Sequence, residues 1–166
     1  TITTFEAGST DQINISITNN QKVVITYSDS GDGGIGKAIV GSLNGMDAMT
    51  FGTTTAFSGT SDSHWIYSCY DEAVDKIVIH WNDTVAVKTK VIIGDVDPDA
   101  YTISFGTAVE TSANALIYNG IGYDSTSKKT FITYEDTGGA YVASLRFVGT
   151  VVTIDTQVNF IIRQIF

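Results

Sequence analysis

Lys76-Ile-Val-Ile-His-Trp81 is one of three related stretches, the others being Lys22-Val-Val-Ile-Thr-Tyr27 and Lys128-Lys-Thr-Phe-Ile-Thr-Tyr134. Each stretch ends in an aromatic residue, and the three aromatic positions are separated by 54 and 53 residues. Each aromatic residue is followed two positions later by an aspartate. Self-similarity at a fixed period of this length is typical of a repeat architecture.

The sequence on the C-terminal side of each stretch follows the same period. It reads Lys37-Ala-Ile-Val-Gly-Ser-Leu, Lys90-Val-Ile-Ile-Gly-Asp-Val and Tyr141-Val-Ala-Ser-Leu-Arg-Phe in the three copies. Next come Met49-Thr-Phe-Gly, Ile103-Ser-Phe-Gly and Val152-Thr-Ile-Asp. The third copy therefore departs from the Thr-Phe-Gly pattern, and its loop after the aromatic residue is shorter.

The pattern within each copy is that of short strands. Runs rich in Val, Ile, Thr, Tyr and Phe are separated by Gly, Asn, Asp and Ser, and no long window has helical spacing. The first strand of a unit is expected at Trp65–Tyr70 and Leu116–Tyr123, and the three repeated motifs supply the other strands. Short connections predict antiparallel meanders. We therefore expect a single all-β domain, residues 1–166, of three four-stranded units (approximately 14–62, 63–113 and 114–160) that resembles a β-propeller.

The two ends of the sequence also resemble parts of the repeat. Thr1–Phe5 matches the fourth strand (compare Thr102–Phe105), and Phe160–Phe166 resembles the start of another first strand. Closed propellers have four or more units, so three units predict an incomplete ring or a part of a larger assembly. We expect other protein chains to complete the sheets, in an oligomer or a larger assembly.

Composition excludes several classes of partner. Lys and Arg number 9 against 18 Asp and Glu, so the formal charge is −9 and nucleic acid is not expected as a partner. No apolar run approaches the ~18 residues of a membrane span, and no membrane partner is expected. The single cysteine, Cys69, allows no disulfide within the chain and is interpreted as a small hydrophobic residue of a strand.

The sequence offers few residues for catalysis or metal binding. The two histidines, His64 and His80, have no partner at ligand spacing, and His80 lies inside a predicted strand. The loop from Asp29 to Gly34 alternates acidic residues with glycine, which could hold calcium but equally suits a hairpin turn. We expect no catalytic residue, no metal and no cofactor, and leave calcium in this loop open.

Aromatic residues are the remaining candidates for ligand binding. Tyr27, Trp81 and Tyr134 recur at one place in the repeat, so we interpret them as a packing layer between sheets. Trp65 and Tyr101 stand outside that pattern beside polar loops. They are the candidates for stacking on a sugar ring.

The repeat resembles those of bacteriophage tail-fibre and adhesin-type proteins and of some bacterial surface proteins. The resemblance covers about residues 14–160 and lies in the Lys-Ile-Val-Ile-x-Trp, Ala-x-Val-Gly and Ile-Ser-Phe-Gly motifs. It implies a β-propeller-like architecture and a location in a virion, outside the cell or at a cell surface. It carries over no catalytic residue.

Three functions are therefore considered. The leading hypothesis is a non-enzymatic structural or adhesion module of a viral or extracellular appendage, such as a fibre, spike or tail component. The alternative is a carbohydrate-binding β-propeller lectin that recognises a cell-surface glycan. The third is a polysaccharide hydrolase, but the Ser-x-Asp-x-Gly-x-x-Trp motif of sialidase-type propellers is absent from the sequence.

Overall fold

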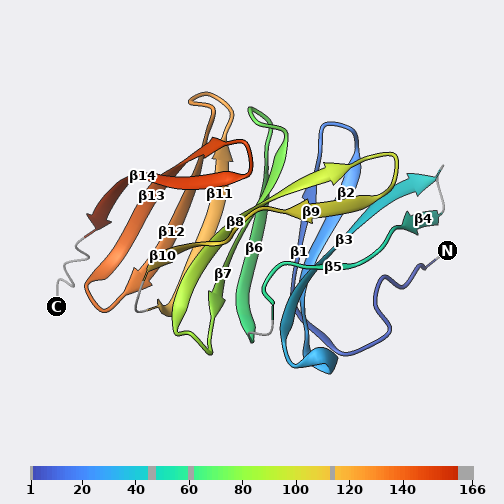
Figure 1. Ribbon diagram of the computed structural model, residues 1–166, viewed down its shortest axis with the longest axis horizontal. Helices are drawn as coiled ribbons and strands as arrows, with labels where there is room; N and C mark the ends of the chain where they lie inside the picture. Colours follow the sequence, from blue (N-terminus) through green and yellow to red (C-terminus); the bar gives the residue numbers. More distant parts are fainter. Residues whose placement is uncertain (1, 45–47, 60–61, 113–114, 161–166) are drawn as a thin grey trace.

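Three antiparallel sheets follow one another along the chain in this computed structural model, which describes residues 2–44, 48–59, 62–112 and 115–160 (Figure 1). The first sheet has the strand order β1-β2-β3-β4, with β5 also paired to β3. The second has the order β6-β7-β8-β10, with β9 also paired to β8, and the third has the order β11-β12-β13-β14. The outer strand of the first two sheets is thus interrupted. The predicted all-β fold of three four-stranded antiparallel units is confirmed.

The strand bounds follow the repeat. The first sheet contains β1 (Thr10–Ile17), β2 (Lys22–Asp29), β3 (Ile35–Asn44), β4 (Ala48–Phe51) and β5 (Thr55–Ala56), with a 3-10 turn, η1 (Ser30–Asp32), after β2. The second contains β6 (Ser63–Asp71), β7 (Lys76–Asp83), β8 (Lys88–Asp97), β9 (Thr102–Phe105) and β10 (Val109–Ser112). The third contains β11 (Ala115–Asp124), β12 (Lys129–Asp136), β13 (Gly139–Val148) and β14 (Val151–Phe160).

The second strand of each unit determines how the sheets pack. In β2 and in β7 every residue after the first lysine is buried, so both faces of these strands are covered. A short continuous apolar run such as Val-Val-Ile or Ile-Val-Ile suits a strand of this kind. We call the face that carries Val23, Ile25 and Tyr27 the back face of its sheet, and the face that carries Val24 and Thr26 the front face.

The strand pairings place the equivalent residues of the other units. Thr26, His80 and Thr133 occupy one position, because they pair with Ala38, Val91 and Val142 of the third strands. The back face of the second sheet therefore carries Ile77, Ile79 and Trp81, and that of the third carries Thr130, Ile132 and Tyr134. The front faces carry Val78 and His80 in the second sheet, and Phe131 and Thr133 in the third.

Each front face packs against the back face of the following sheet. One core combines Val24, Ala38 and Val40 of the first front face with Ile77, Ile79 and Trp81 of the second back face. The next combines Val78, Val91 and Ile93 with Ile132, Tyr134 and Ala143. The repeated aromatic residues Tyr27, Trp81 and Tyr134 are all buried. Trp81 and Tyr134 lie between sheets, as their spacing predicts, whereas Tyr27 lies on the first back face and packs against Phe5.

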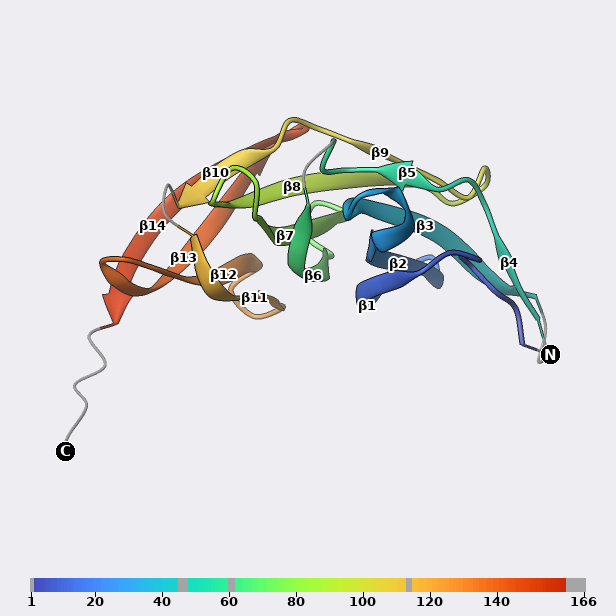
Figure 2. The same cartoon turned by 90° about the horizontal axis from the view of Figure 1, so that it is seen from below.

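Stacking in one direction produces an open arch. Figure 2 shows the first strands β1, β6 and β11 on the inner side and the outer strands on the convex side. The first sheet and the third lie at the two ends of the arch and do not meet (Figure 2). The arrangement is an incomplete, propeller-like ring.

The glycine of the Thr-Phe-Gly motif has a packing function. A β-carbon at Gly52 would lie 1.9 Å from the carbonyl oxygen of Tyr101, in the β8–β9 turn of the next sheet. A β-carbon at Gly106 would lie 2.3 Å from the carbonyl oxygen of Thr150, in the β13–β14 turn. Glycine therefore allows the next unit to approach. The third unit has Asp155 at this position, and no further unit packs there among the described residues.

The expectation that Thr1–Phe5 forms a fourth strand is wrong, because residues 2–5 form no strand and pair with no third strand. Phe5 instead covers the first back face. Its ring lies 5.3 Å from that of Tyr27, edge to face, as the ring of Phe57 lies 5.1 Å from that of Trp81. The expected strand at Phe160–Phe166 falls outside the described residues, apart from Phe160 at the end of β14.

We predict that Gly52→Ala lowers the free energy of unfolding by about 1–3 kcal/mol, because the added methyl group overpacks a contact between two backbones. Gly122→Ala in β11 is the control, since a β-carbon there meets nothing within 4 Å. It should change stability by less than about 0.5 kcal/mol. Urea unfolding of both variants measures the difference. Equal effects of the two substitutions would contradict the packing function of Gly52.

Candidate functional site

Among the described residues, no sheet packs against the back face of the first sheet. Its core cluster, Val23, Ile25, Tyr27 and Ile39, contains residues of this sheet alone. Phe5, Met49 and Phe51 pack against the cluster, and Phe5 belongs to the segment before β1. The residues near Phe5 are thus sheltered, but the inner part of the face is open.

The isoleucines of β1 show how far this back face is exposed to solvent. Ile13 lies in a β-bulge at the position that Ile66 occupies in β6, and is 55% exposed where Ile66 is 3% exposed. Ile15 and Ile17 follow on the same strand and are 59% and 62% exposed. Adjoining exposed apolar side chains on a sheet face indicate an interaction surface. The strict alternation Ile-x-Ile-x-Ile was the sequence signal for it, and sequence analysis missed it.

The front face of the third sheet is likewise not covered by any part of the chain that the structure describes. Phe131 and Val142 are half-buried and Thr133 is exposed, whereas Val24 and Thr26 of the first front face are fully buried. A groove of about 670 Å³ lies on the third sheet. Its lining residues are Tyr118, Asn119, Thr133, Tyr134, Glu135, Ala140 and Tyr141.

Three of these lining residues have equivalents that are covered in the first sheet. Thr133, Glu135 and Ala140 correspond to Thr26, Ser28 and Gly36. In the first sheet this place is filled by Phe57, whose ring lies 2.5 Å from where a β-carbon of Gly36 would be. Where Thr133, Glu135 and Ala140 line it, the groove is therefore the counterpart of the place that an aromatic ring occupies in the interface between the first two sheets.

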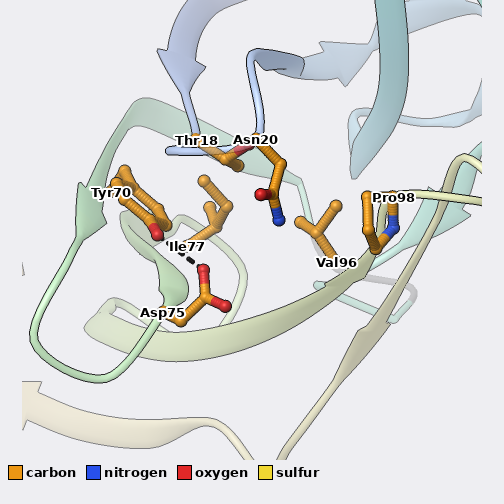
Figure 3. A pocket seen from close by; sticks show the side chains of 7 residues that line it. All are labelled: Thr18, Asn20, Tyr70, Asp75, Ile77, Val96 and Pro98. Atoms are coloured by element: carbon orange, nitrogen blue, oxygen red, sulfur yellow. Dashed lines mark hydrogen bonds between the residues drawn. The ribbon is translucent and has the colours of Figure 1, made fainter.

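A second cavity lies between the first two sheets and measures only about 10 Å³ (Figure 3). The Tyr70 hydroxyl donates to the Asp75 carboxylate at 2.5 Å, and burial raises the pKa of Tyr70 to about 12. A space of this size holds one water molecule at most. It cannot accept a sugar ring. The lining residues labelled in Figure 3 are Thr18, Asn20, Tyr70, Asp75, Ile77, Val96 and Pro98.

Trp65 is half-buried in the bulge of β6, on the inner side of the arch. Its backbone has φ 48°, and its N–H donates to the side chain of Gln12, which has φ 55° at the equivalent bulge position of β1. Trp65 therefore lies within the repeat and not outside it. The His64 ring lies 5.4 Å from the indole.

Tyr101 lies in the β8–β9 turn, at the opposite end of the second sheet from Trp65. It packs against the core between the first two sheets, and the Lys22 ammonium lies 4.6 Å from its ring centre. This places Tyr101 in the contact between neighbouring units. The structure does not bring the two residues together, and their binding of glycan stays a prediction.

The two histidines lie in different surroundings. His80 is fully buried on the second front face, 3.3 Å from both the Gly120 carbonyl oxygen and the Thr111 hydroxyl. Burial lowers the pKa of His80 to about 3, so the ring is neutral at pH 7. His64 lies 3.1 Å from the Asp62 carboxylate and is half-exposed.

The loop considered for calcium is organised by a lysine. Lys37 lies 2.7 Å from the Asp29 carboxylate and 2.8 Å from that of Asp32, and its hydrogen bond lowers the pKa of Asp29. Asp83 pairs in the same way with Lys90, at 2.6 Å. In the first two units the repeated aspartate thus anchors the third strand. Within the described part of the chain, no three His, Cys, Asp or Glu side chains cluster as metal ligands would.

Cys69 is half-buried beside the core between the second and third sheets. Burial raises the pKa of its thiol to about 12, which leaves it uncharged and unreactive at neutral pH.

No family model, no curated protein and no solved structure matches this chain. Among the described residues, no helix is long and apolar enough to cross a membrane. The fold and the faces described above therefore carry the functional argument.

We predict that the stability of the chain falls as the pH decreases from 6.5 to 5, because His80 binds a proton when unfolded but not when folded. Its folded pKa lies below its unfolded value, so its contribution is complete above pH 6.5 and is lost as the pH falls toward 3. The loss between pH 6.5 and 5 should be about 2 kcal/mol.

Chemical unfolding at several pH values measures this slope. His80→Thr, which places there the residue found at positions 26 and 133, should remove most of it. An unchanged slope in this variant would show that other groups cause the pH dependence.

Proposed function

We propose that the chain is a non-enzymatic structural module, a part of a fibre, spike or other appendage of a virion or cell surface, which works by packing against further β-sheets. The observation that carries the proposal is the exposure of Ile13, which occupies the position of the buried Ile66. Exposure of an apolar sheet face of this kind to water is unfavourable in free energy, so association with a partner that covers it is favoured. Its partners would be other protein chains.

Two further features support a structural function. His80 and Cys69, whose pKa values are strongly shifted by burial, lie in the contact between the second and third sheets and not in an open cleft. Stacking of similar units gives an extended and stable scaffold, as in other repeat proteins. The virion or cell-surface setting rests on the resemblance of the repeat to tail-fibre and adhesin-type sequences.

We expect the chain to associate reversibly as its concentration rises from about 1 to 200 μM, with a mass above the 17.8 kDa of one chain. Added salt should strengthen the association, because each chain has a formal charge of −9 and like charges repel. Sedimentation velocity measures both effects. Ile13→Asp should weaken association at least tenfold, whereas Val85→Asp, at an apolar position 72% exposed in the β7–β8 turn, should not.

Two results would contradict the proposal. A chain that stays monomeric at every concentration and salt would rule out assembly through its free faces. Release of sugar from a polysaccharide by the isolated chain would rule out the non-enzymatic part.

A carbohydrate-binding lectin is the second candidate, because partly exposed aromatic residues line the inner side of the arch. Tyr67 and Tyr118 are 37% and 65% exposed on β6 and β11, and Trp65 lies two residues before Tyr67. Aromatic faces of this kind stack on sugar rings. A glycan array decides: specific binding that is lost in Trp65→Ala but kept in Tyr101→Ala would favour the lectin at this surface, and no binding would remove it.

A further inference from the structure

We propose that a second copy of this chain is the partner, docked head to tail, so that two copies close a ring of six sheets. In each contact the back face of one copy's first sheet packs on the front face of the other copy's third sheet. The inference rests on the proposed function and names the partner in it.

The two contacts between sheets inside the chain have the same arrangement. Both join a front face to the following back face, and no other pairing of sheet faces occurs among the described residues. The two faces left open are one back face and one front face. They are the two members of the same pair, so a second copy presents to each open face the kind of surface that covers its equivalents.

The front face of the third sheet keeps the character of the covered front faces. Phe131 stands where Val24 and Val78 are, and Thr133 stands where Thr26 is. On the third strand, Val142 stands where Ala38 and Val91 are. A face of this composition is suited to receive another sheet.

The first complementary feature is an aromatic ring and a groove. Phe57 covers Trp81 from the first front face, over Gly36, and Phe5 already covers Tyr27 in the same edge-to-face manner. A second copy docked head to tail would bring its Phe5 to the groove beside Ala140, the equivalent of Gly36. The groove of about 670 Å³ has room for an aromatic ring.

The second complementary feature lies on the innermost strands. Position 68 of the second sheet contacts positions 14 and 16 of the first, because Ser68 bonds to Asn14 and to Ser16. Ile15 is the equivalent of Ser68 on the open back face. The equivalents of Asn14 and Ser16 on the open front face are Gly120 and Gly122.

The sizes of these residues match across the proposed contact. A protruding isoleucine would meet two glycines that leave space above β11, and a β-carbon at Gly122 would meet nothing within 4 Å. In the contact between the second and third sheets the equivalent positions hold Cys69 and Ile121, which pack against the same core, so a small residue is again combined with a large one. The open faces therefore fit each other as the covered faces do.

Two positions do not match, and one of them is Glu135, whose charged side chain stands where the buried Ser28 is. Asp155 stands where Gly52 and Gly106 admit the backbone of the next unit, and its carboxylate lies 3.6 Å from Arg146. The contact between copies is therefore looser at the outer rim than the contacts inside a chain. It follows that the Asp155 side chain, from its β-carbon outward, limits the affinity.

Ring closure follows from the number of sheets. Two copies supply six sheets, and closed propellers have four to eight. A head-to-tail contact closes a ring when its rotation fits and otherwise extends into a filament. Because the sheets of one chain already form an arch, we expect the ring, with twice the 17.8 kDa of one chain.

The test uses two variants that each block one face. Ile15→Lys blocks the back face at an exposed position, and Gly122→Lys blocks the front face at an open one. Each variant alone should be monomeric at concentrations where the wild-type chain is dimeric. Mixed in equal amounts, they should form a one-to-one dimer through the single intact pair of faces, and Val85→Lys should dimerise as the wild type does. Sedimentation velocity gives the masses, and circular dichroism confirms that each variant is folded.

Each other result has a defined meaning. If Ile15→Lys is monomeric but Gly122→Lys still dimerises, the back faces pair with each other, which overturns the head-to-tail contact and leaves the proposed structural function standing. A wild-type chain that stays monomeric overturns both the head-to-tail contact and the proposed structural function. Filaments in place of dimers would overturn the closed ring.

A substitution that should raise the affinity between copies tests the contact at the outer rim, where Asp155 lies. Asp155→Gly restores the residue of the other two units and should tighten dimerisation about tenfold, or about 1.4 kcal/mol. Asp155→Ala is the control, because it removes the charge but keeps the β-carbon, and should leave most of that gain unrealised. Equal affinities of the two variants would overturn the assignment of this position to the contact.

Discussion

The packing of a front face on the following back face is the interaction on which the rest of the structure depends. The second strand of the first two units is apolar on both sides, and a strand of this kind is stable only when both of its faces are covered. Trp81 shows the consequence, because it is buried only when the preceding sheet brings Phe57 over it. A single sheet of this type could not bury its own apolar surface, so each unit needs a neighbour on each side.

This constraint also explains the polar residues that the repeat retains. Asp29 and Asp83 accept an ion pair from a third-strand lysine of their own unit, which fixes the edge of the sheet against which the next one packs. Ser68 and His80 bond across the contact between sheets and set its alignment. Glycine at position 52 lets two backbones approach. The motif is therefore a set of contacts within and between units.

The repeated features were accessible to sequence analysis because three copies report the same physical requirement. The number of units, the four strands in each and the burial of Trp81 all follow from the spacing. The ends were not accessible, because Thr1–Phe5 shares its residues with a fourth strand but has no third strand beside it. Trp65 was placed outside the repeat, since the bulge that makes it the counterpart of Gln12 leaves no mark in composition. The open faces emerge only when the exposure of Ile13 is compared with that of Ile66.

A disulfide between copies tests most directly whether the open back face meets the open front face. The hydroxyl oxygens of Ser16 and Ser68 lie 2.7 Å apart inside the chain, and the equivalent positions between copies are 122 and 15. A chain carrying Ile15→Cys and Gly122→Cys, with Cys69→Ser to remove the native thiol, should oxidise to a dimer joined by two bonds from position 15 to position 122. Peptide mapping that finds bonds only between two positions 15, or only within one chain, would contradict the account.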